Sequence, residues 1–200
     1  LYTGSCRVAA EGGLAPLIAA AAFLGVEPLR DAAAAAVAEG LTPEGCLDAW
    51  ELGERFQLPA LVEAAAAHAR RHFTALVPTP AFAALPPPRL EALLAHDGLA
   101  VPGEGAVLDA LARWHAAADP PPGEADVARL LGHVRFRLVP EEKVRQALAS
   151  SALLSSGAAK GAVAMAVFAD EGAMRRPRMG DGKLYAVGGF AGGSSLRSVE

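Results

Sequence analysis

The sequence predicts an all-α fold that ends in a short β segment, and three observations support this prediction. Forty-seven of the 200 residues are alanine, which favours helices because it loses no side-chain entropy there. Aromatic residues make up only 6% of the chain and β-branched residues are few, which argues against a large all-β fold. Apolar residues recur at helical spacing between prolines and glycines that interrupt the pattern.

Charge and cysteine content argue against several classes of protein. The net charge is −4, from 18 basic and 22 acidic residues, whereas a nucleic-acid-binding domain shows a basic stripe. An anionic membrane surface is disfavoured by the same balance. Two cysteines, Cys6 and Cys46, cannot form a disulfide framework and are ordinary in a reducing compartment. A cytoplasmic protein is therefore expected.

The length of the apolar runs argues against a membrane span. The longest uncharged apolar run, LAPLIAAAAFLGV from Leu14, has 13 residues, whereas a span needs about 18 or more. The chain starts at Leu1 and not at methionine, so we expect it to be part of a longer protein.

Helical segments follow one another along most of the chain. We expect helices over residues 14–24, 28–39, 43–56, 59–73, 80–85, 89–95, 104–117, 124–131, 141–149 and 158–170. Thr42 can cap the third of these, and Pro43 suits its first position. The stretch DPPPGE at 119–124 is expected to be a loop, because three prolines cannot continue a helix. Trp50 and Trp114 lie on the apolar faces of their helices, so we predict that both are mostly buried.

The character of the sequence changes from Met174. The segment MRRPRMGDG indicates a linker, and KLYAVGGF at 183–190 is the first good strand, followed by the turn-forming AGGSS. A hairpin without neighbouring strands is marginal in water. We therefore expect residues from about Arg175 onward to be mobile, and the linker to be cut by proteases before the helical region.

The helix expected over 43–56 has a broader apolar arc than an ordinary surface helix. Six apolar or small residues cover about half of its circumference: Cys46, Ala49, Trp50, Leu52, Gly53 and Phe56. Burial on two sides within the domain would explain this width. A partner that faces Leu52 and Phe56 would explain it equally, and both interpretations stay open at this point.

The residue pattern gives little support for catalysis. His68 and His72 share a helix face at a spacing that can bind zinc, but HARRH has no following Glu or Cys as a third ligand. Cys46 lies beside Trp50 on the apolar arc, where cysteine usually packs as a small hydrophobe. The glycines around Glu104 lack the third glycine and the preceding strand of a phosphate loop. We expect no catalytic, cofactor-binding or metal-ligating residues, and a protein that is not an enzyme.

Seven stretches, in their order along the sequence, resemble the kelch-like family, in which a BTB domain, a BACK domain and a kelch propeller follow one another. LYTG and PLIAAAAFLGVEPLRDAAAAAV resemble the end of the BTB domain. LTPEGCLDAWELGERFQLPALVEAAAAHARRHF resembles the helical pair that opens the BACK region, the 3-box. DGLAVPGEGAVLDALARWHAAAD, with Glu104, Arg113 and Trp114, and LLGHVRFRLVPEEKV resemble two later BACK signatures. LYAVGGF and LRSVE resemble the opening of a first kelch blade.

Two positions depart from the family pattern. Gly45 stands where the family usually has asparagine, and Arg137 stands where proline is usual. Glycine weakens a helix start slightly because it has more backbone entropy to lose. Both positions lie at expected helix boundaries, so they do not weaken the resemblance.

The resemblance implies a BACK-type array of helical hairpins with a short β stub of an incomplete kelch propeller. It implies that residues 1–40 are the C-terminal part of a BTB domain and that residues 41–172 are the BACK domain, with the 3-box pair at 42–73. Residues 173–182 would then be a linker, and residues 183–200 the start of the first kelch repeat.

The resemblance also implies a function, that of a substrate adaptor of a cullin-3 RING ubiquitin ligase. The BTB domain and the 3-box would hold cullin-3, the propeller would select the protein substrate, and the full-length protein would be a homodimer. Because the 3-box helices of the family form one wall of a groove that receives a cullin segment, Leu52 and Phe56 are the candidate cullin-binding residues. The alternative is a cytoskeletal or actin-associated kelch protein without a ligase role. A BTB loop motif (an apolar residue, any residue, then Glu) would distinguish the two.

Overall fold

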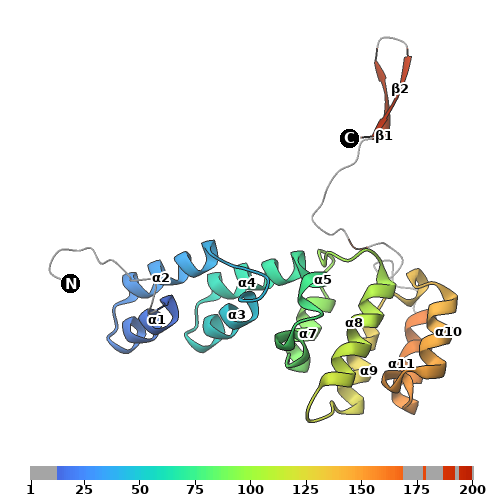
Figure 1. Ribbon diagram of the computed structural model, residues 1–200, viewed down its shortest axis with the longest axis horizontal. Coiled ribbons are helices and arrows are strands. Elements are labelled where there is room, and N and C mark those ends of the chain that lie inside the picture. Colours follow the sequence, from blue (N-terminus) through green and yellow to red (C-terminus); the bar gives the residue numbers. More distant parts are fainter. Residues whose placement is uncertain (1–12, 169–177, 179–186, 192–193, 200) are drawn as a thin grey trace.

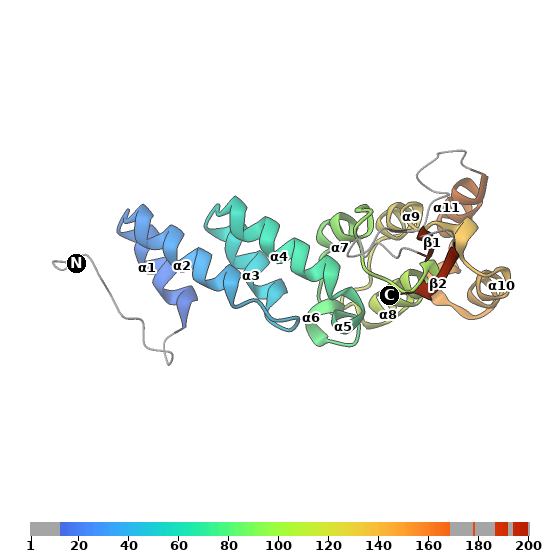
Figure 2. The same cartoon turned by 90° about the horizontal axis from the view of Figure 1, so that it is seen from above.

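The computed structural model describes residues 13–168, 178, 187–191 and 194–199. Its helices form an elongated row in which successive helices lie side by side, from the N-terminal pair at one end to α10 and α11 at the other (Figures 1 and 2). They are α1 (Leu14–Phe23), α2 (Glu27–Glu39), α3 (Cys46–Arg55), α4 (Pro59–Arg71), α5 (Phe73–Leu76), α6 (Pro80–Ala83), α7 (Pro87–Leu94), α8 (Glu104–Ala117), α9 (Glu124–Gly132), α10 (Glu141–Ser150) and α11 (Gly157–Phe168). The all-α class predicted from the sequence is confirmed for this array.

Every helical segment expected from the sequence overlaps a helix, and α8 has the predicted bounds, whereas α5 lies almost wholly outside the predicted segments. The start of α3 differs, because the backbone first makes a turn over 43–45. Thr42 Oγ1 accepts a hydrogen bond from the Gly45 N–H at 3.2 Å, so the threonine caps this turn and Gly45 takes the N-cap position of α3. The sequence pattern also misses the 3-10 turns η2 (Phe136–Leu138) and η3 (Ala152–Leu154), because three residues are too few to show a helical period.

A two-stranded antiparallel hairpin follows the helices in the sequence. Strand β1 (Val187–Ala191) pairs with β2 (Ser194–Val199), with Val187 opposite Val199. The expected strand at 183–190 overlaps β1, and its first four residues lie outside the described residues. That this hairpin opens a kelch repeat stays a prediction.

Helices α3 and α4 form the predicted hairpin, and they lie very close to each other at Gly53. A Cβ atom at this position would lie 2.8 Å from Val62 Cγ2 and 3.1 Å from the Val62 backbone nitrogen, which leaves no room for a side chain. Gln57 turns the backbone between the helices with a φ of 55°, and the Leu58 N–H donates back to the Gly53 carbonyl at 2.8 Å. Close contact and turn together fix the geometry of the pair.

One hydrophobic core runs through the described array, and both tryptophans belong to it. Trp50 is buried and donates from Nε1 to Glu54 Oε1 at 2.9 Å. Trp114 is 1% exposed and donates from Nε1 to the Leu85 carbonyl at 2.9 Å. The predicted burial of both tryptophans is confirmed. In each case the indole N–H has the polar partner that a buried tryptophan requires.

We expect Trp114→Ala to destabilise the protein by about 3–5 kcal/mol, as truncation of a buried aromatic residue commonly does. The truncation removes apolar burial and leaves the Leu85 carbonyl without its donor. Chemical denaturation with urea measures the change. Phe23→Ala is the control, because Phe23 is 90% exposed and surface changes usually stay within about 0.5 kcal/mol. A loss below about 1 kcal/mol for Trp114→Ala would contradict its role in the core.

Candidate protein-binding site

The predicted site residues Leu52 and Phe56 lie at the C-terminal end of α3. Both are half-buried and pack against the edge of the core, whereas Cys46, Trp50 and Gly53 of the same helix are buried. The broad apolar arc is thus divided into a buried face and a half-exposed margin, formed by Leu52 and Phe56. This margin is accessible to a partner, and its contact with one stays a prediction.

A charged link holds α3 against α7 and so orients this margin. Glu54 Oε2 accepts hydrogen bonds from Arg89 Nη2 at 2.6 Å and from Arg89 Nε at 3.1 Å, while its Oε1 accepts from Trp50. Arg89 Nη1 also lies 3.6 Å from Glu51 Oε2. The polar side of α3 is therefore used to attach the helical pair to the next part of the array.

A groove of about 560 Å³ lies between α2 and the start of α4. Small and apolar side chains form much of its lining: Ala34, Ala35, Ala38, Leu58, Pro59 and Leu61. Arg30, Asp31 and Glu39 add charges of both signs. Gln57, the residue after Phe56, lines the groove, but neither Leu52 nor Phe56 does.

Sequence reasoning missed this groove, because it depends on how α2 packs on α4. The run of alanines along α2 is not a signal for a groove by itself. Ala34, Ala35 and Ala38 lie on adjoining positions of one helix face, but small side chains can equally let two helices pack closely, and Ala33 and Ala34 are buried in the core.

Cys46 and the histidine pair do not form a reactive centre in the structure. Burial raises the pKa of the Cys46 thiol to about 11, and its Sγ donates to the Pro43 carbonyl at 3.2 Å, so the thiol is protonated at neutral pH. The rings of His68 and His72 lie 4.4 Å apart. Burial lowers the pKa of His68, with His72 and Arg71 acting in the same direction.

The described residues contain neither a cluster of metal ligands nor a membrane-spanning helix. No group of three histidine, cysteine, aspartate or glutamate side chains there could hold a metal ion. Among the described helices, none combines the length and the hydropathy of a membrane span.

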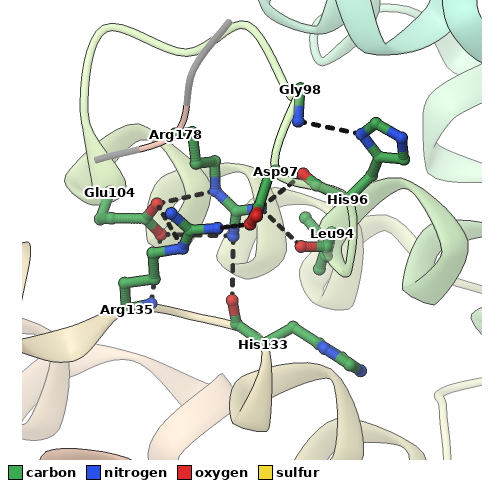
Figure 3. Close-up of polar contacts among 8 residues, drawn as sticks. All are labelled: Leu94, His96, Asp97, Gly98, Glu104, His133, Arg135 and Arg178. Atoms are coloured by element: carbon green, nitrogen blue, oxygen red, sulfur yellow. Dashed lines mark hydrogen bonds and ion pairs between the residues drawn. The ribbon is translucent and has the colours of Figure 1, made fainter. Parts of the chain in front are cut away.

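A second polar feature lies around Glu104, the first residue of α8, whose side chain is 3% exposed (Figure 3). Arg178 Nε donates to Glu104 Oε1 at 2.7 Å, and the Arg135 N–H donates to Oε2 at 3.2 Å. The Arg135 guanidinium pairs with Asp97 and lies 3.9 Å from Glu104 Oε1. Two cations therefore surround one buried carboxylate.

The expectation of mobility from about Arg175 onward is wrong at Arg178. The side chain of Arg178 is 2% exposed and bonded to residues of the helical array. The proline, glycine and arginine content of this segment is typical of a linker, but composition does not reveal a pocket built by distant helices. The neighbouring positions 169–177 and 179–186 lie outside the described residues.

Comparison with known proteins identifies the relatives of this protein. The profile of the BACK family (BTB And C-terminal Kelch) matches residues 46–149. Kelch-like protein 35 of Mus musculus is 33% identical over 139 residues, which cover 70% of this sequence and 24% of the relative. Kelch-like protein 21 of Homo sapiens is 37% identical over 139 residues, 69% of this sequence and 23% of the relative. Human kelch-like protein 25 is 30% identical over 154 residues, which cover 76% of this sequence and 26% of the relative. The sequence spans about a quarter of the length of these relatives.

We predict that Cys46 reacts with a thiol reagent at least about 100-fold more slowly in the folded than in the denatured protein at pH 8. The raised pKa alone reduces the thiolate fraction by about this factor. Because the folded state holds this proton more tightly, the contribution of Cys46 to stability is complete below about pH 9 and is lost as the pH rises towards 11. Absorbance assays on a Cys6→Ser background isolate Cys46. Equal rates in both states would contradict its burial.

Proposed function

This protein belongs to the BACK domain family of kelch-like proteins, and from this premise we propose that it is part of a substrate adaptor of a cullin-3 RING ubiquitin ligase. The observation that carries the proposal is the groove between α2 and the start of α4. We propose that α3 and α4 are the 3-box pair of the family, so that this groove borders the 3-box. Such an adaptor makes no bond itself. It acts by raising the effective concentration of a target lysine near the ubiquitin-conjugating enzyme.

The groove suits an extended apolar segment of a cullin. Its volume of about 560 Å³ lies in the range of sites that enclose small ligands. The alanines of α2 let a peptide backbone approach closely, and the exposed Pro59 and Ala60 at the start of α4 offer apolar contact. Arg30 and Asp31 pair with each other at 2.8 Å at the edge of the groove, and we propose that this pair also binds polar groups of the same segment and fixes its direction.

We propose that Leu52 and Phe56 extend this surface along α3. Phe56 precedes Gln57, which lines the groove, so a segment that continues beyond the groove would pass over the half-exposed margin. A partly buried aromatic side chain of this kind often contributes much of the binding energy of an interface.

The domain assignment follows the same family pattern. We propose that residues 1–40 end a BTB domain, that residues 41–172 form the BACK domain, and that residues 173–182 link it to a kelch repeat starting at 183. The full-length protein would be a cytoplasmic homodimer that holds its protein substrate with the propeller. The BACK array would set the distance between the cullin and this substrate.

Phe56→Ala and Leu52→Ala should each weaken binding of the cullin-3 N-terminal domain by at least tenfold, about 1.4 kcal/mol, and leave the melting temperature nearly unchanged. Truncation removes apolar contact with the cullin but little of the core. Calorimetric titration of the full-length protein measures the affinity. Unchanged affinity together with a large drop in melting temperature would show that both residues serve only the core.

A charge in the groove provides a sharper test of the groove itself. Ala35→Glu places a carboxylate among the apolar lining residues at an exposed position of α2, so cullin affinity should fall at least tenfold because a charge would be buried on binding. Ala32→Glu is the matched control, since Ala32 is exposed on the same helix and does not line the groove. Equal affinity of the two variants would exclude the groove as the cullin site.

A further inference from the structure

The side chain of Arg178 is enclosed in a pocket made by three separate parts of the helical array (Figure 3). Nε donates to Glu104 Oε1 at 2.7 Å, and Nη2 lies 3.5 Å from Glu104 Oε2. Nη1 donates to the carbonyls of Leu94 at 2.6 Å and His96 at 3.1 Å. Nη2 also donates to the carbonyl of His133 at 2.9 Å. Every nitrogen of the guanidinium therefore has a partner.

The pocket has the geometry and the charge that a guanidinium requires. Leu94 is the last residue of α7 and His133 is the C-cap of α9, so their carbonyls belong to the negative ends of helix dipoles. The acceptors surround a planar fork of five N–H groups, which an arginine offers and a lysine does not.

The local charge balance also calls for a second cation. Glu104 and Asp97 bring two negative charges to this region, and Arg135 compensates one of them, with its guanidinium paired to Asp97. A carboxylate as deeply buried as Glu104 is costly when its charge is not compensated. Arg178 supplies the missing positive charge.

We propose that this pocket is a latch for Arg178, which anchors the segment that follows α11 at the junction of α7, α8 and α9. Helix α11 ends at Phe168 and β1 begins at Val187. An extended backbone spans at most about 3.5 Å per residue, so the latch keeps the start of β1 within about 30 Å of the pocket. Without the latch, β1 could start up to about 65 Å from the end of α11. The latch thereby restricts where the hairpin and whatever follows it can lie. This inference goes beyond the proposed function and does not depend on it.

Trypsin offers a direct test in the full-length protein, because its specificity pocket must bind the same side chain that the latch holds. Trypsin cannot cut after position 178 while the guanidinium is in the latch. Arg178→Lys keeps a trypsin site but loses the fork, so we expect cleavage after position 178 to be at least tenfold faster in this variant than in the wild type. Mass spectrometry of the fragments identifies the cut. Equal or slower cleavage in Arg178→Lys would overturn the latch.

Two changes within α8 separate the latch from general effects of charge removal. Glu104→Gln leaves the sequence around position 178 intact and should also accelerate cleavage there. Asp109→Asn is the matched control, because Asp109 is a mostly exposed carboxylate on the same helix that pairs with Lys143. If Asp109→Asn accelerates cleavage after position 178 as much as Glu104→Gln does, the latch is overturned.

Chemical rescue tests the pocket without a protease. Arg178→Ala should lower the melting temperature of the full-length protein, and about 20 mM ethylguanidinium should restore part of the loss by occupying the vacated site. Ethylammonium at the same concentration should not restore it, because it lacks the planar fork. An unchanged melting temperature in Arg178→Ala, or equal effects of the two cations, would overturn the proposal.

Discussion

The carboxylate of Glu104 is buried where the end of α7, the start of α8 and the end of α9 meet, and the packing of these helices depends on how its charge is compensated. Breaking a buried ion pair typically costs about 3–5 kcal/mol, because a charge is left without a partner. Arg135 and Arg178 prevent this cost, and the helix-end carbonyls satisfy the remaining donors of Arg178. One polar cluster thus joins elements that the apolar core alone would hold with less specificity.

The high alanine content shapes the rest of the array. Alanine buries less area than leucine, so the core depends on a few large side chains such as Trp114 and the edge-to-face pair of Phe73 and Phe82, whose ring centroids lie 5.6 Å apart. Small residues also let helices approach closely, as at Gly53. Where no large residue fills the space, as along α2, the same composition leaves the groove that we propose as the cullin site.

Helix α3 combines a buried face with a half-exposed margin that we propose meets a partner. Its buried face contributes Cys46 and Trp50 to the core, and its acidic side is attached to Arg89 of α7. The half-exposed margin of Leu52 and Phe56 remains between them. A helix attached in this way presents such a margin in a fixed direction, as the proposed adaptor function would require.

The amino-acid sequence by itself determined most of the helices, the burial of the two tryptophans and the family, whereas only the tertiary structure decided the groove and the site of Arg178. The first set depends on local signals: the bounds of α8 follow from Gly103 and the apolar period, and the burial of Trp114 follows from its phase on that helix. Even locally, the turn at 43–45 delayed the start of α3 beyond the predicted residue, because Thr42 bonds to the Gly45 N–H before the helix begins. The groove arises from the packing of α2 on α4, and Arg178 binds the Leu94 carbonyl across 84 positions of the sequence. No periodicity or motif contains such information, because the acceptors of the pocket are backbone carbonyls, which every residue has, and only the fold brings three of them together around one carboxylate.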